Sequence, residues 1–133
     1  MLCLDTTFII DLLREKKDAL SKFEAIKDHE VYTTILNVYE LKAGSQRKFQ
    51  PHIILRESAA FNKFLASITI FDLNLNSVDK SAEINGELTS KGLIIEEFDI
   101  LIAGICLANG CSKIITKNAK HFSRIKGLKV ETY

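Results

Sequence analysis

The sequence predicts a single α/β domain with a mostly parallel, Rossmann-like central sheet. Short apolar runs alternate along the chain with longer segments whose apolar residues recur at helical spacing, an order typical of parallel sheets. The chain has 133 residues, close to the length of one average domain, and 47% of them are hydrophobic, which is enough for a core. No repeat, low-complexity segment or internal linker divides it, so we expect one domain over residues 1–133.

The first half of the chain predicts strands and helices in alternation. The apolar run at residues 2–4 indicates a buried parallel strand, and Thr6 or Thr7 can cap a helix that continues to about Arg14. Apolar spacing and the only proline, Pro51, then predict a helix, a strand, a helix, a loop and a further helix. Their expected ranges are 18–27, 31–33, 37–45 (with Gly44 placed to end or loosen the helix), 46–52 and 53–66.

The second half continues the same alternation. A β-branched run at 68–71 predicts a strand, and residues 77–90 repeat apolar side chains at helical spacing until Gly92. A strongly apolar helix is expected over 97–108, with Gly110 after it as the C′ residue. The remaining expected elements are a strand at 113–116, a turn or short helix at 119–122 and an edge strand at 128–131.

Composition narrows the class of protein. No run approaches the ~18 consecutive apolar residues of a membrane span, and the N-terminus lacks the features of a signal peptide. The three cysteines form no CxxC pair, so we expect buried, reduced thiols in a cytoplasmic protein rather than a zinc site.

Charge is unevenly distributed although the net charge is only +1. Residues 72–99 contain seven acids against two lysines, and residues 113–133 contain six Lys or Arg against one acid. Separated zones of this kind can hold a polyanion beside a metal-binding carboxylate cluster. They can equally be solvated helix faces, and composition alone favours that simpler interpretation.

Acidic residues are expected to converge at one edge of the sheet. Asp5 follows the first strand, and residues 116–118 follow another strand. Glu40 lies about one turn into a helix that starts at the carboxyl end of a strand, and Asp99 lies in the first turn of another helix at the same edge. Parallel α/β sheets bind ligands at this edge. Each acid alone has an ordinary explanation, as a helix cap, an acid on a helix flank or an acid that favours a helix dipole. Together they would repel one another, and a hard divalent cation such as Mg²⁺ or Mn²⁺ would relieve the repulsion.

At these residues the sequence resembles the PIN-domain family, and within it the VapC-type toxins of prokaryotic toxin–antitoxin pairs. Four segments carry the resemblance in the family's order and spacing. They are residues 4–11 (LDTTFIID), 40–44 (ELKAG), 98–103 (FDILIA) and 115–122 (ITKNAKHF).

The resemblance implies an α/β/α fold and a ribonuclease that depends on Mg²⁺ or Mn²⁺. Asp5, Glu40 and Asp99 match the family's acidic triad, which would bind the metal and carry out catalysis. Asn118 stands where many members have a fourth acid, and the Thr7 hydroxyl is placed to hydrogen-bond to the site.

The resemblance also implies RNA as substrate, a homodimer, and inhibition by a small cognate antitoxin. Lys117, Lys120 and Arg124 are candidates for contacts with the RNA backbone. His121 invites a general-base role, but a lone surface histidine before an apolar Phe is more often incidental, and we interpret it so. Residues 49–64 are the candidate surface for the antitoxin or the dimer, although a plain core helix explains them nearly as well.

Two alternatives stay open at this point. A haloacid-dehalogenase-like phosphatase also begins with a strand and an Asp, but it needs a second acid two residues later, where this chain has Thr7. A catalytically silent PIN-fold binding module is favoured by Asn118 and opposed by the three retained acids.

Overall fold

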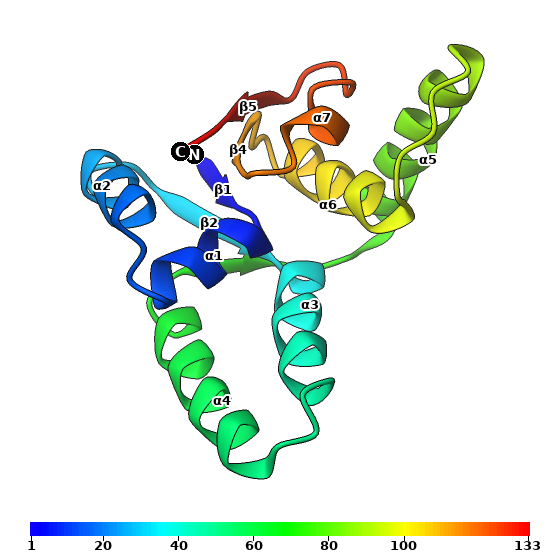
Figure 1. Ribbon diagram of the computed structural model, residues 1–133. Coiled ribbons are helices and arrows are strands. Elements are labelled where there is room, and N and C mark those ends of the chain that lie inside the picture. Colours follow the sequence, from blue (N-terminus) through cyan, green and yellow to red (C-terminus); the bar gives the residue numbers. More distant parts are fainter.

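The computed structural model describes residues 1–133 and contains five strands and seven helices (Figure 1). In chain order they are β1 (Leu2–Leu4), α1 (Thr6–Leu13), α2 (Lys17–Ala25), β2 (Val31–Thr34), α3 (Ile35–Gln46), α4 (Pro51–Leu65), β3 (Thr69–Phe71), α5 (Leu75–Ser90), α6 (Glu97–Ala108), β4 (Lys113–Ile115), α7 (Ala119–Phe122) and β5 (Lys129–Glu131). Every element predicted from the sequence is present, with ends that coincide or are displaced by at most two residues.

The sheet is entirely parallel, with strand order β3-β2-β1-β4-β5. The first strand is central and is flanked by β2 on one side and β4 on the other, while β5 is an edge strand as expected. The strand order therefore reverses at β1, and the carboxyl ends of β1 and β4 form the kind of switch point at which parallel α/β sheets bind ligands.

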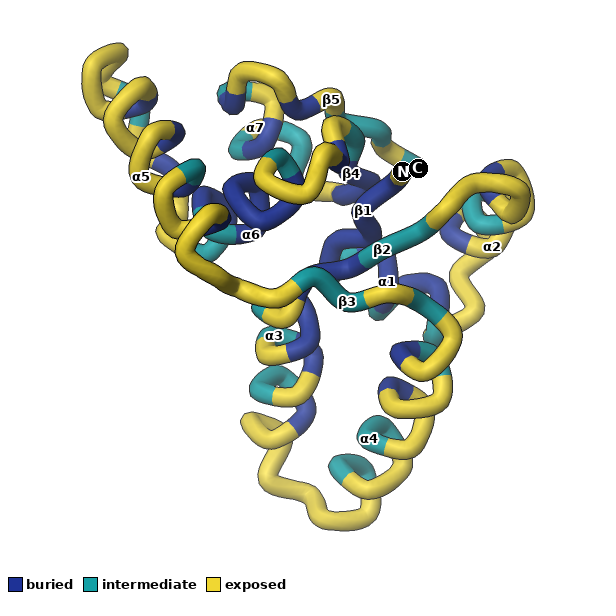
Figure 2. The backbone as a smooth tube through the Cα atoms, turned by 180° about the vertical axis from the view of Figure 1, so that it is seen from behind, coloured by how far each residue is buried: buried dark blue, intermediate teal, exposed yellow.

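Helices cover both faces of the sheet and bury two apolar clusters (Figures 1 and 2). One cluster packs side chains of α1 to α4 against the sheet, and the other packs α5, α6 and α7 against the opposite face. Successive side chains of β1 point to opposite faces of the sheet, so Leu2 and Leu4 pack in the first cluster and Cys3 packs in the second. The α/β/α arrangement implied by the sequence is confirmed.

Some helix ends differ from those predicted. Asp5, not Thr6 or Thr7, is the N-cap residue of α1. Thr34 caps α3, which begins at Ile35, two residues before its expected start, and Gly44 lies inside that helix rather than at its end. Pro51, expected in a loop, is the first residue of α4, a position where its missing N–H is not needed.

The apolar helix α6 is fixed closely against α5. A side chain at Gly104 would overlap Ser81, so glycine is needed for this approach. The helix ends at Ala108 with Asn109 as its C-cap, and Gly110 follows at a positive φ of 74°, as predicted for the C′ residue. This packing sets where the first turn of α6, with Asp99, meets the sheet.

All three cysteines are free and buried. No helix has the length and apolar character to cross a membrane.

Candidate active site

Polar side chains from four segments meet at the carboxyl ends of β1 and β4. Asp5 follows β1, Thr116 follows β4, Glu40 lies in the second turn of α3, and Asp99 lies in the first turn of α6. The Asp5 residue is 5% exposed and the Asp99 residue 9%, so both carboxylates are largely removed from water. The convergence expected from the sequence is thus present.

Asp5 is held by three side chains. Its Oδ1 accepts a hydrogen bond from Asn37 Nδ2 at 2.9 Å, and its Oδ2 accepts from Thr116 Oγ1 at 2.6 Å and from Thr7 Oγ1 at 3.2 Å. The contact expected of Thr7 is therefore confirmed. The side chain makes no capping hydrogen bond to α1, so helix capping does not explain its position. Burial raises the pKa of Asp5, and the nearby Asp99 carboxylate adds to the increase.

Asn37 connects Asp5 to Glu40. The same Nδ2 group that donates to Asp5 donates to Thr6 Oγ1 at 3.0 Å, and Thr6 in turn donates to Glu40 Oε2. Burial raises the pKa of Glu40, and the charges of Asp5 and Asp99 raise it further. The sequence analysis did not identify Asn37. The spacing Thr34-x-x-Asn37, typical of a helix cap, marks it, but only the fold shows that its amide faces Asp5.

Asp99 has two donors on one oxygen. Asn118 Nδ2 lies 2.9 Å and His121 Nδ1 lies 2.6 Å from its Oδ2. The interpretation of His121 as an incidental surface histidine was wrong, because α7 directs its ring at Asp99. The rings of Tyr39 and Phe98, which precede Glu40 and Asp99 in the sequence, meet edge to face at 5.6 Å and join α3 to α6 beside the site.

The three acids lack a basic partner that would neutralise them. No Lys or Arg forms an ion pair with Asp5, Glu40 or Asp99, and His121 is the only basic side chain in contact with any of them. Carboxylate oxygens with uncompensated charge are the donors that a hard divalent cation prefers. As placed, no three His, Cys, Asp or Glu side chains are close enough to ligate one ion together. Asp5 and Asp99, which have no Lys or Arg partner, therefore fit such a cation, and Glu40 would contribute through water.

The three predicted RNA-contact residues differ in their surroundings. Lys117 Nζ is 2.5 Å from Asp11 Oδ2, so this ion pair partly neutralises its charge. The Lys117 backbone N–H donates to Thr7 Oγ1. Arg124 donates to the carbonyl oxygen of Ile94 at 3.2 Å, whereas Lys120 is exposed and forms no ion pair. Asp11, which sequence reasoning passed over, is 5% exposed, and its position in the apolar run FIIDLL was the available signal.

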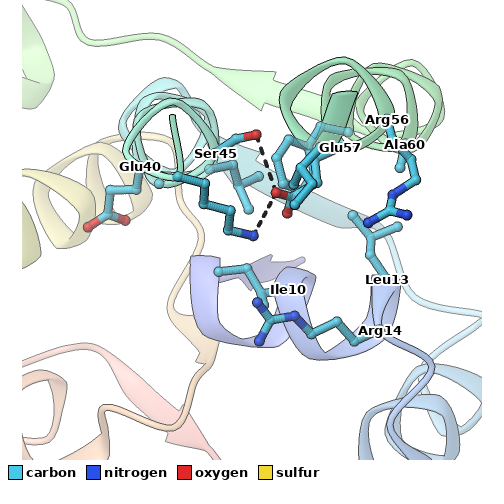
Figure 3. A pocket seen from close by; sticks show the side chains of 13 residues that line it. Ile10, Leu13, Arg14, Glu40, Ser45, Arg56, Glu57 and Ala60 are labelled. Carbon is cyan, nitrogen blue, oxygen red and sulfur yellow. Dashed lines mark hydrogen bonds and ion pairs between the residues drawn. The ribbon is translucent and has the colours of Figure 1, made fainter. Parts of the chain in front are cut away.

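A groove lies beside the site, between α1, α3 and α4 (Figure 3). Its volume is about 590 Å³, and apolar side chains such as Ile10, Leu13 and Phe61 line it. Figure 3 shows Glu40 at one end, with its carboxylate directed away from Glu57. The groove therefore borders the acidic site.

Comparison with known sequences identifies relatives over nearly the whole chain. Ribonuclease VapC1 from Rickettsia felis is 30% identical over 132 residues, which cover 98% of this chain and 95% of that protein. The tRNA(fMet)-specific endonuclease VapC from Salmonella typhimurium is 23% identical over 130 residues, covering 98% and 96%.

Solved structures share the fold. VapBC2 from Rickettsia felis, bound to a DNA fragment from its promoter, matches 99% of this chain and 98% of its own with a TM-score of 0.87 and 23% identity. DNA-bound VapBC from Salmonella typhimurium gives a TM-score of 0.85 at 21% identity, covering 98% and 96%. A family model described as PIN domain matches residues 2–128, and this chain belongs to the PIN domain family.

Proposed function

We propose that this chain is a metal-dependent endoribonuclease that acts as the toxin of a toxin–antitoxin pair. The observation that carries the proposal is the convergence of Asp5, Glu40 and Asp99 at the switch point of the sheet, without a Lys or Arg partner. Relatives that match 98% of the chain are named ribonucleases or endonucleases, which supports this reaction. The family assignment leaves the phosphatase alternative without support.

The three acids divide the work according to their surroundings. Asp5 and Asp99 would hold Mg²⁺ or Mn²⁺, with Glu40 bound directly or through water. When bound, such an ion neutralises the scissile phosphate and activates the attacking water. Asp5 is kept in place by Asn37 and Thr116. Glu40, whose pKa is raised by burial and by the nearby Asp5 and Asp99, would accept a proton from the attacking water.

Asn118 favours one metal ion over two. Its amide brings no charge, and its Nδ2 is already used as a donor to Asp99 Oδ2. A second cation at this side would therefore lack the carboxylate that many family members place there.

Substrate contacts are expected from the basic C-terminal segment. Lys120 is the most available of the predicted cations, because Lys117 pairs with Asp11 and Arg124 bonds to the Ile94 carbonyl. Contacts of this kind position a phosphate backbone without reading its sequence. We propose that the RNA lies across α7 and that the reaction takes place in the cytoplasm.

The groove between α1, α3 and α4 is the proposed antitoxin surface. It overlaps the predicted range 49–64 and offers apolar side chains together with Arg14 and Arg56, neither of which forms an ion pair. An antitoxin segment with apolar and acidic side chains suits this groove, and it would lie beside Glu40.

Two measurements test the partners. Hydrogen exchange should show protection of α4 in the complex with the antitoxin. Light scattering should give about 30 kDa for the predicted homodimer, twice the 15.0 kDa of one chain. Unprotected α4 amides would contradict the assignment of this groove.

The proposed reaction is tested by RNA cleavage. We would incubate a mixed pool of structured RNAs with the native chain in Mn²⁺, in Mg²⁺ and in EDTA, and compare Asp99→Asn. We expect metal-dependent cleavage that falls by at least about 100-fold in the variant, because one ligand loses its charge.

Calorimetry separates the possible failures. Absence of both cleavage and metal binding would overturn the nuclease proposal and leave a silent PIN-fold binding module. Metal binding without cleavage would instead indicate that the pool lacks the RNA substrate. Asp79→Asn, an exposed acid on α5, is the matched control and should cleave like the native chain.

A further inference from the structure

The hydrogen bonds of Asp99 are one-sided. Both donors, Asn118 Nδ2 at 2.9 Å and His121 Nδ1 at 2.6 Å, reach Oδ2, and no protein group donates to Oδ1. An ionised carboxylate with one oxygen fixed and the other free of protein donors is suited to bind a cation through the free oxygen. The two donors therefore decide which oxygen faces the site.

With Asp99 ionised, the contact also assigns the tautomer of His121. An ionised Asp99 only accepts hydrogen bonds, so the short contact to Nδ1 requires a proton on Nδ1. A neutral imidazole in this position then has Nε2 unprotonated. The amide of Asn118 lies 3.1 Å from Nδ1, where both groups can donate side by side to the same carboxylate oxygen.

Local structure holds this arrangement in place. His121 precedes Phe122, whose side chain is fully buried and anchors α7 in the core. The Asn118 backbone N–H donates to Thr116 Oγ1 at 2.9 Å, and Thr116 Oγ1 donates to Asp5. One short segment, residues 116–121, thus fixes both Asp5 and Asp99.

We propose that His121 is a positioning residue that orients Asp99 so that Oδ1 is presented to the metal ion. This role rests on the proposed function and adds a residue that lies outside the acidic triad. A hydrogen bond from an outer group fixes the orientation of a ligating carboxylate, and its loss typically weakens metal binding by about 10–100-fold.

The first test is Mn²⁺ affinity measured by titration calorimetry. We expect His121→Ala to weaken binding by about 10–100-fold. His121→Asn should restore most of it, because the Asn amide nitrogen occupies nearly the same place as Nδ1 of His. His29→Ala is the matched control, since His29 is exposed between α2 and β2 and lies outside every proposed binding surface.

The outcomes distinguish the role of His121 from the proposed metal-dependent function on which it rests. If the native chain binds no Mn²⁺, the proposed active site is overturned and the role of His121 with it. If the native chain binds Mn²⁺ and His121→Ala binds it equally well, only the role of His121 is overturned.

A second measurement determines the histidine tautomers in the native chain, so it does not depend on the folding of a variant. The ¹⁵N chemical shifts of the three histidines, recorded without metal at a pH of about 8.5 where free imidazole is neutral, report each tautomer. We expect the Nδ1-protonated form for His121, while His29 and His52 serve as exposed references. A proton on Nε2 instead would overturn the proposal.

Discussion

Asp5 illustrates how a single residue can be unfavourable for stability and still be retained. Its carboxylate is buried after an apolar strand, and burial together with Asp99 raises its pKa. Hydrogen bonds from Thr116, Asn37 and Thr7 reduce this cost without removing it, because the pKa stays above the ordinary value. The folded chain therefore holds a charge that it would hold more easily when unfolded, as expected for a site adapted to bind a cation.

This leads to a prediction for Asp5→Asn. In metal-free buffer at pH 7 the variant should be more stable than the native chain by about 1 kcal/mol, because it removes the buried charge. Asparagine retains an acceptor for Asn37, and its amide can donate to the Thr116 hydroxyl. Urea denaturation measures the difference, and Asp79→Asn serves as the exposed control, with no change expected.

The stability cost of the Asp5 charge should depend on pH in a defined direction. A raised pKa means that the folded state binds the proton more tightly than the unfolded state, whose Asp pKa is about 3.9. The destabilisation is therefore absent well below pH 4 and develops as the pH rises through the two pKa values. A stability difference independent of pH between about 3 and 7 would contradict this explanation. Added Mn²⁺ should stabilise the native chain and not the variant.

At the scale of elements, hydrophobic periodicity was sufficient to locate the strands and helices. The apolar runs at 2–4 and 113–116 and the helical spacing of 97–108 each correspond to an observed element. Burial in the two clusters produces those patterns, so they can be read from one sequence. The predicted positions of Asp5, Glu40 and Asp99 followed from the rule that parallel strands place their carboxyl ends at one edge.

Side-chain hydrogen bonds across elements could not be read in the same way. The capping box of Thr34 and Asn37 shifts the start of α3 and also directs the Asn37 amide to Asp5, 32 residues away in the chain. The contact between His121 and Asp99 likewise joins α7 to α6, and its formation depends on how the buried Phe122 orients α7. Local spacing indicates which residues are polar, but only the packed fold shows which of them meet.

At the scale of the whole molecule, one polar cluster joins the end of the chain to its beginning. Asp11 on α1 accepts hydrogen bonds from Lys16, Lys117 and Tyr133, at 2.7, 2.5 and 3.0 Å. The Tyr133 ring packs edge to face on Phe8 at 4.8 Å, and Lys117 Nζ lies 5.1 Å from its centre. Because Lys117 lies between Thr116 and Asn118, the cluster also fixes the segment that holds the acidic site.

Acid titration should separate the contribution of this cluster from that of Asp5. Burial alone would raise the pKa of Asp11, but the bonds from Lys117 and Lys16 hold it at about 2. The folded state thus binds the proton less tightly than the unfolded state, whose Asp pKa is about 3.9, so the cluster stabilises the fold above about pH 4 and this stabilisation is lost as the pH falls toward 2. Both lysine side chains are about half exposed, at 50% and 49%, and solvent screening reduces the effect.

Asp11→Asn should therefore be less stable than the native chain by about 1 kcal/mol at pH 7, with the difference closing between about pH 4 and pH 2. Urea denaturation across that range measures it, and Tyr133→Phe, which removes only one of the three bonds, should give a smaller loss. The sign is opposite to that of Asp5→Asn, since one carboxylate is paired with cations and the other is not. Equal pH profiles for the two variants would show that the lysines do not determine the charge state of Asp11, and that the cluster stabilises the chain by packing alone.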